Sequence, residues 1–363
     1  MANPHERALT YPFGDNLPAP GAAMELAPGV RWLRMRLPFA LDHINLWLLR
    51  DRTPGPDGID GWTVVDCGIA DDSTRAAWEQ VFAGELQGLP MLRVIVTHMH
   101  PDHIGLAHWL CERWTTPERE CRLWISATDW NAARISSQST TGFGGDSAAR
   151  FFARHGLVDP DSLAKVRARS NYYASMVPAV PQRFRRLMDG MTVDIGGRAW
   201  TCIAGYGHAP EHIALHCAEL GLLISGDMVL PRISTNVSVI DLEPEADPLP
   251  LYLRSLDRLR TLPADTLVLP SHGKPFRGLH ERIAQLHAHH DERFAEVLAA
   301  CAEVPRSAAE LIPVLFKRTL DLHQTTFAMG EAIAHVHALS GQGRLRAVPG
   351  VDGVLRWLGA SGA

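Results

Sequence analysis

The sequence predicts an α+β fold in which helices cover two facing sheets, an αββα sandwich. Strand patterns and helix patterns recur in two halves of the chain between about residues 30 and 278. Helices outside two packed sheets bury the apolar faces of both kinds of element. The chain of 363 residues is long for one ordinary domain, so we expect an accessory unit beside the sandwich.

The first half opens with strands. Apolar and arginine residues alternate over 33–37, the period of a half-buried strand, and residues 44–49 form a more continuous apolar run. After a turn rich in proline and glycine, residues 63–66 are predicted to form a short strand, followed by a helix capped by Ser73. The compact apolar strand 92–96 then ends in a loop that precedes another helix, a common place for functional residues.

The second half follows a change in composition. Residues 136–190 combine a polar stretch with arginines and aromatics, and we interpret them as a largely helical insertion. Strands and one helix then return, at 199–203, 212–216, 222–224, 249–262 (the helix) and 266–269.

The end of the chain changes to helices followed by a hairpin. Helices are predicted over 279–302, after a cap at Ser307 and over 325–339, and two short strands flank the turn Pro-Gly-Val-Asp-Gly. This order predicts a small winged-helix-like domain. The predicted units are a poorly ordered lead-in, a main domain with the sandwich and the insertion, and the winged-helix-like domain, at 1–25, 26–278 and 279–363.

Composition excludes several classes of protein. No apolar run approaches the ~20 residues that span a bilayer, and residues 1–20 lack the basic start and apolar core of an export signal. Six scattered cysteines without a C-x-x-C pair favour reduced thiols and a cytoplasmic location. The formal net charge of −5 supplies no overall attraction to a polyanion, so neither nucleic acid nor a membrane is an expected partner.

Metal-competent side chains are concentrated in residues 97–105. Imidazole and carboxylate ligands suit zinc, manganese or iron, and histidines merely filling a loop seldom reach this density. Three further candidates each follow a predicted strand beside a glycine; alone, each fits an ordinary loop or turn. Together they supply the seven ligands of a dinuclear site: His98, His100, Asp102, His103, His208, Asp227 and His272.

This pattern resembles the metallo-β-lactamase superfamily, whose H-x-H-x-D-H motif and three later ligands recur here. The resemblance implies one metal on His98, His100 and His208, a second on Asp102, His103 and His272, and Asp227 as the bridge. It also implies that Asp66, in Val-Asp-Cys-Gly, orients a ligand histidine. A turn at the end of a strand is the alternative role for Asp66.

The same resemblance implies a hydrolase. Two divalent metal ions, zinc first with iron or manganese as alternatives, and a bridging hydroxide would cleave a small acyl substrate. Asp102 is assigned a second, catalytic role, in which it accepts the proton of the attacking water and passes it on. The C-terminal pattern is similar to the β-lactamase-like protein 2 branch, and the glyoxalase II branch favours a thioester ahead of a lactone.

Three alternatives stay open beside the acyl hydrolase: an RNA nuclease or phosphodiesterase, a mononuclear iron oxygenase of sulfur compounds, and a non-enzymatic scaffold. The C-terminal domain is predicted to pack or to form a homodimer. Later histidines are assigned to solvated or interface faces: His287, His289, His290, His323, His335 and His337. Substrate contact and an ordinary structural role stay equally open for Tyr172, Tyr173, Arg183, Arg185, Arg186, Tyr206 and Asn236.

Overall fold

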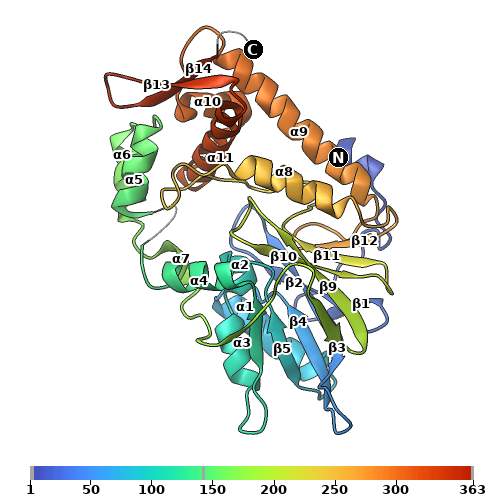
Figure 1. The fold of residues 1–363 in the computed structure, drawn as a ribbon. Coiled ribbons are helices and arrows are strands. Elements are labelled where there is room, and N and C mark those ends of the chain that lie inside the picture. The colour runs from blue at the N-terminus through green and yellow to red at the C-terminus, as the bar shows by residue number, and fades with distance from the viewer. Residues whose placement is uncertain (1–3, 141–143, 361–363) are drawn as a thin grey trace.

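The computed structural model describes residues 4–140 and 144–360 of the chain. Within these residues two sheets face each other with helices outside them, and a separate hairpin lies near the C-terminus (Figure 1). The predicted αββα sandwich is therefore confirmed. Parts of the predicted lead-in, insertion and C-terminal domain lie outside the described residues, at 1–3, 141–143 and 361–363.

The larger sheet has its strands in chain order, antiparallel up to β4 and parallel from there. They are β1 (Ala23–Ala27), β2 (Val30–Arg36), β3 (His43–Arg52), β4 (Asp60–Val65), β5 (Met91–Ile95), β6 (Arg122–Ile125) and β7 (Phe184–Arg186). Three helices pack on its outer face: α1 (Asp72–Gly84), α3 (Ala107–Trp114) and α4 (Ala127–Ser136). The cap of α1 differs from the prediction, because the side chain of Asp71, not Ser73, accepts from Thr74 N at 2.7 Å.

The smaller sheet has the strand order β12-β11-β10-β9-β8. Its strands are β8 (Thr192–Ile195), β9 (Arg198–Gly205), β10 (His212–Cys217), β11 (Leu222–Gly226) and β12 (Leu267–Pro270). Three helices lie outside it, as Figure 1 shows: α8 (Pro248–Leu259), α9 (Leu279–Ala300) and α11 (Leu322–Gly341).

Alternation along the strands explains why the two sheets stack. In β3, Trp47 points into the apolar layer between the sheets, whereas Leu46 and Leu48 contact the helices outside. In β11, Ile224 faces the inner layer and Leu223 the outer helices. Strands that bury both faces need a nearly continuous apolar sequence, which both segments have.

The remaining elements follow the predicted order. The insertion contains α5 (Gly145–Arg154), α6 (Pro160–Ala168) and α7 (Tyr172–Met176), together with strand β7, which was not expected. The C-terminal region contains α9, α10 (Ala308–Leu315) and α11, then the hairpin β13 (Leu345–Pro349) and β14 (Leu355–Gly359). Ser307 caps α10 in a capping box, as its position predicts.

The lead-in has more structure than expected. A short 3-10 helix, η1, spans Pro4–Ala8, Thr10 pairs with Arg277, and Leu9 is buried in the outer apolar cluster of the smaller sheet. Burial of this leucine gives the segment a docking contact that its proline-rich sequence did not indicate. Among the described helices, none has the length and apolar character that a bilayer crossing requires.

Candidate metal centre

The seven candidate ligands lie at one end of the sandwich. Four of them follow β5, on residues 98–100 and the short helix α2 (Pro101–Ile104). The other three follow β9, β11 and β12. These strands run in the same direction, because β10 is antiparallel to both β9 and β11 and β12 is parallel to β11. The carboxyl ends of β9, β11 and β12 therefore lie at the same end of the smaller sheet.

Glycines beside two ligands are required by the backbone. Gly207 precedes His208 with a φ of 98°, and a Cβ there would lie 2.4 Å from Pro248 O. Gly226 precedes Asp227 with a φ of 52°, and its Cβ would lie 2.1 Å from His212 Nε2. Any other residue would strain the backbone and displace a neighbour, so glycine at each position lets the strand end turn toward the centre.

One group of ligands consists of three histidines. His98 Nε2 lies 2.9 Å from His100 Nδ1 and 3.2 Å from His208 Nε2, and the last two rings approach at 3.1 Å. His98 is fully buried. Three imidazole nitrogens thus converge on a single point.

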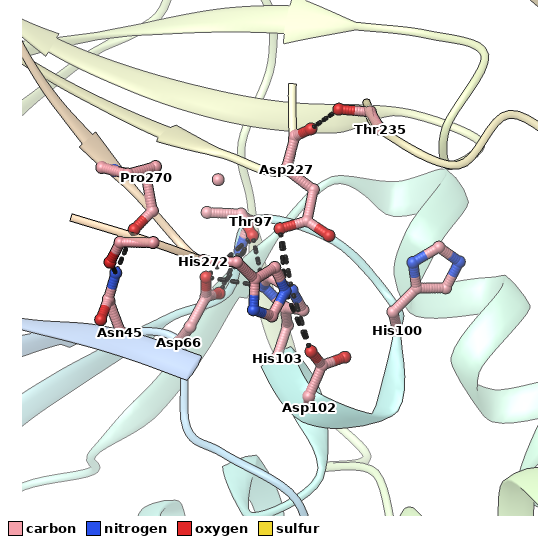
Figure 2. A network of polar contacts seen from close by, with 12 residues as sticks. Asn45, Asp66, Thr97, His100, Asp102, His103, Asp227, Thr235, Pro270 and His272 are labelled. Atoms are coloured by element: carbon pink, nitrogen blue, oxygen red, sulfur yellow. Dashed lines mark hydrogen bonds and ion pairs between the residues drawn. The ribbon is translucent and has the colours of Figure 1, made fainter. Parts of the chain in front are cut away.

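The second group consists of Asp102, His103 and His272 (Figure 2), and Asp227 lies between the two groups. Asp227 Oδ1 lies 3.5 Å from His103 Nε2 and 3.4 Å from His272 Nε2. Its other oxygen, Oδ2, lies 3.4 Å from His208 Nε2 in the first group. Each carboxylate oxygen of Asp227 therefore faces a different group.

Hydrogen bonds on the far side of the rings determine which nitrogen carries the proton. His208 Nδ1 lies 2.7 Å from the carbonyl of Asn236, and His272 Nδ1 lies 2.8 Å from the carbonyl of His43. A carbonyl only accepts, so Nδ1 donates in both residues. Nε2 of each ring is therefore the nitrogen that faces the centre, as metal coordination requires.

These residues fit a pair of divalent metal ions. Within the described part of the chain, His103 Nε2 and Asp227 Oδ1 are buried without a hydrogen-bond partner. Buried polar atoms are rarely left unpaired, and lone pairs at about 3 Å from one another repel unless a cation lies between them. The donor set of imidazole and carboxylate is the one that zinc, iron and manganese accept.

The charged groups of the centre shift one another's pKa values. Burial and the neighbouring His208 lower the pKa of His100 to about 3, so its ring is neutral. Burial opposes ionisation of Asp102, but His103 and His272 outweigh it and lower the pKa of this carboxyl to about 2. Burial likewise opposes protonation of His272, whereas Asp227 and Asp102 raise its pKa to about 10.

Asp66 has the position expected of an orienting residue. Its Oδ2 accepts from His103 Nδ1 at 2.8 Å, and its Oδ1 accepts from Thr97 N at 2.8 Å (Figure 2). Asp66 is fully buried and has a φ of 64°, which is uncommon outside glycine. Such strain at the end of β4 persists because several hydrogen bonds determine the conformation.

The substitution Asp66→Asn is expected to weaken metal binding about 10- to 100-fold. The introduced amide would oppose His103 Nδ1–H, which favours the tautomer with its proton on Nε2 and removes the lone pair that points into the centre. Competition of zinc with a chromophoric chelator measures the change. Asp71→Asn, at the N-cap of α1, is the matched control and should keep wild-type affinity; wild-type affinity in Asp66→Asn would contradict the orienting role.

Several supporting residues were not predicted. Asn45 donates to the carbonyls of Pro270 and Gly273 at 2.7 and 2.9 Å and so fixes the loop of His272. Asp129 accepts from Met99 N at 2.8 Å and holds the loop between the first two histidines. A polar residue in the apolar strand 44–49 was the one available signal for Asn45. The sequence contained no signal for the role of Asp129, because the partners of this residue lie far away in the sequence.

Several residues for which the sequence left substrate contact and a structural role equally open make contacts within the protein. Tyr173 donates to the carbonyl of Met99 at 2.5 Å, and Tyr172 pairs with His323 Nδ1 at 3.2 Å. Tyr206 N donates to Ser255. The arginines lie on or beside β7, where Arg183 is exposed and Arg185 stacks on Trp124.

The later histidines are more buried than expected. His290 Nδ1 and His335 Nε2 lie 3.3 Å apart, and both residues are buried between α9 and α11. The prediction of a solvated or interface face is therefore wrong for this pair. Their apolar neighbours, such as Phe294, explain why burial is tolerated in the neutral form, since burial lowers the pKa of His335 to about 4.

Comparisons with known proteins identify the family of the chain. The family model of the metallo-beta-lactamase superfamily matches residues 41–272, and that of the metallo-beta-lactamase-like C-terminal domain matches residues 294–360. A solved beta-lactamase domain protein from Burkholderia ambifaria is 57% identical, with a TM-score of 0.92, over 99% of this chain and 100% of that one.

Two further relatives are more distant. A metallo-beta-lactamase family protein from Thermus thermophilus is 28% identical, with a TM-score of 0.71, over 92% of this chain and 100% of that structure. The probable metallo-hydrolase YqjP of Bacillus subtilis (strain 168) is 26% identical over 85% of this chain and 92% of its own length.

Proposed function

Because the chain belongs to the metallo-β-lactamase superfamily and is a hydrolase of that group, we propose that it cleaves a small acyl substrate at a dinuclear metal centre. The observation that carries the proposal is the position of Asp227. Its two oxygens face two separate groups of donor atoms, as a bridging ligand would. The ligands are the seven predicted residues, with zinc as the first choice and iron or manganese as alternatives.

When bound, such a metal pair lowers the pKa of a water and polarises the scissile group. The chain contributes the orientation and the proton transfer. Asp102 Oδ2 lies 3.3 Å from His272 Nε2, and its side chain is 18% exposed against 11% for Asp227. Asp102 is therefore the more accessible carboxylate of the two, and we assign to it the transfer of a proton from the attacking water to the leaving group.

The second group of donors favours this function over a mononuclear iron oxygenase. An oxygenase of that kind needs two histidines and one carboxylate, which His98, His208 and Asp227 would satisfy. Asp102, His103 and His272 would then have no role, although they converge within 4.8 Å of one another. A dinuclear hydrolase uses both groups.

The net charge of the chain favours a small-molecule substrate over RNA. With a net charge of −5 the chain offers no general attraction to RNA, which disfavours a nuclease and supports a small-molecule substrate. A thioester is the first candidate and a lactone the second. All six cysteines lie within the described residues, where they are free and buried, and this supports a cytoplasmic location.

A panel of substrates tests the proposed function. The zinc-loaded protein is expected to hydrolyse a thioester or a lactone, with activity lost on chelation, and to leave RNA and phosphodiesters intact. Cleavage of RNA whose binding weakens steeply with salt would instead show a nuclease. Oxygen consumption with bound iron would show an oxygenase and overturn the hydrolytic mechanism.

A further inference from the structure

Helix α11 reaches the metal centre through residues 235–239, which we call the bridging segment. Val239 N donates to the carbonyl of Gly330 at 3.1 Å. A Cβ at Gly330 would lie 2.7 Å from both Ser238 Cβ and Ser238 Oγ. Helix and bridging segment are therefore in direct contact, and only glycine at position 330 allows this approach.

The bridging segment holds two of the proposed ligands. The carbonyl of Asn236 accepts from His208 Nδ1 at 2.7 Å. Thr235 Oγ1 donates to the carbonyl of Asp227 at 2.5 Å (Figure 2). Any displacement of the bridging segment therefore moves His208 and Asp227 together.

Glu331 lies beside the side chain of Asn236. Ser238 Oγ donates to Asn236 Oδ1 at 2.8 Å, which turns the amide N–H of Asn236 toward the Glu331 carboxylate. Burial raises the pKa of Glu331 to about 7, although Arg293 and the bond from Asn236 oppose it. Glu331 is half-buried, and a desolvated carboxyl costs stability that an apolar side chain would not, so packing alone does not explain a glutamate here.

We infer that Gly330 and Glu331 are positioning residues of the metal centre, which hold Asn236 so that its carbonyl orients the imidazole of His208. The inference rests on the proposed metal centre. Within the contacts that the structure describes, neither residue touches a metal ligand, and both act through the bridging segment. Helix α11 of the C-terminal region is then part of the apparatus that sets metal affinity, in addition to covering the smaller sheet.

Zinc affinity of the full-length protein tests the inference. Glu331→Ala is expected to weaken binding about tenfold, the lower end of the range for partners of metal ligands, because Glu331 acts one residue further away. The visible spectrum of the cobalt-loaded protein should change as the His208 ligand field shifts. Glu331→Gln keeps an acceptor for the Asn236 amide and should restore both the affinity and the spectrum.

A matched control separates positioning from stability. Glu310 belongs to the capping box of α10, and Glu310→Ala should lower the thermal midpoint while leaving zinc affinity and the cobalt spectrum unchanged. Should Glu331→Ala fail to fold, Gly330→Ala provides a second test. Alanine favours the helix, so a loss of affinity there would come from the contact with Ser238.

The outcomes distinguish the inference from the proposed function. Two zinc ions on the wild-type chain, with weaker binding in Glu331→Ala and Gly330→Ala, would support both. Two zinc ions with unchanged binding and an unchanged cobalt spectrum in these variants would overturn the inference alone. A folded wild-type chain that binds no metal would overturn the proposed function itself.

Discussion

Asp227→Ala is expected to lower kcat/KM by at least about a thousandfold, a loss on the scale of removing a group that acts in the transition state. The variant should also retain fewer than two metal ions per chain. The reason is geometric, because Asp227 alone among the seven residues presents one oxygen to each group of donors. The core of the sandwich lies between the sheets and excludes Asp227, so most of the fold should persist.

Circular dichroism checks that the Asp227→Ala variant keeps its fold, and metal analysis counts the ions that it retains. Asp257→Ala, an exposed carboxylate on α8, is the control and should keep both metal ions and full activity. Asp227→Asn preserves the shape but removes the charge, so we expect an intermediate loss of metal. Wild-type turnover in Asp227→Ala would exclude the bridging role.

Removal of the metal ions is expected to abolish hydrolysis and to lower the thermal midpoint. A ligand at 1,000 times its dissociation constant stabilises the folded state by about 4 kcal/mol, which corresponds to roughly 5 to 10 °C in a chain of this size. The apoprotein should refold its centre on addition of zinc, because the partners of the histidine Nδ1 atoms belong to the chain itself.

Differential scanning calorimetry before and after dialysis against a chelator measures this shift. Calcium, which prefers oxygen ligands, should neither restore activity nor raise the midpoint, whereas zinc should do both. An unchanged midpoint together with full activity after chelation would be incompatible with a metal-dependent hydrolase.

The sequence was sufficient for the layers of the fold and for the cluster of candidate ligands. Apolar alternation in β3 and β11 follows from the period of a strand, which is local information. The positions of His208, Asp227 and His272 after predicted strands were enough to group them, because parallel strands end at a common edge. Their assignment to individual metals is a proposal that came from resemblance.

Residues that support the metal centre without belonging to the seven proposed ligands could not be predicted from the sequence. Asn45 contacts a loop more than 200 residues away, and Glu331 meets Asn236 from a different layer of the fold. Such pairs have no local pattern, since each residue in isolation fits a turn or a helix face. The burial of His290 and His335 was missed for the same reason: the helix that covers each of them is distant in the chain.

The metal content of the purified wild-type protein, with the ions located by anomalous diffraction, tests the dinuclear centre most directly. We predict two ions per chain, one among His98, His100 and His208 and one among Asp102, His103 and His272, with Asp227 between them. A folded chain that holds no metal, or a single ion with Asp102, His103 and His272 hydrogen-bonded elsewhere, would contradict it.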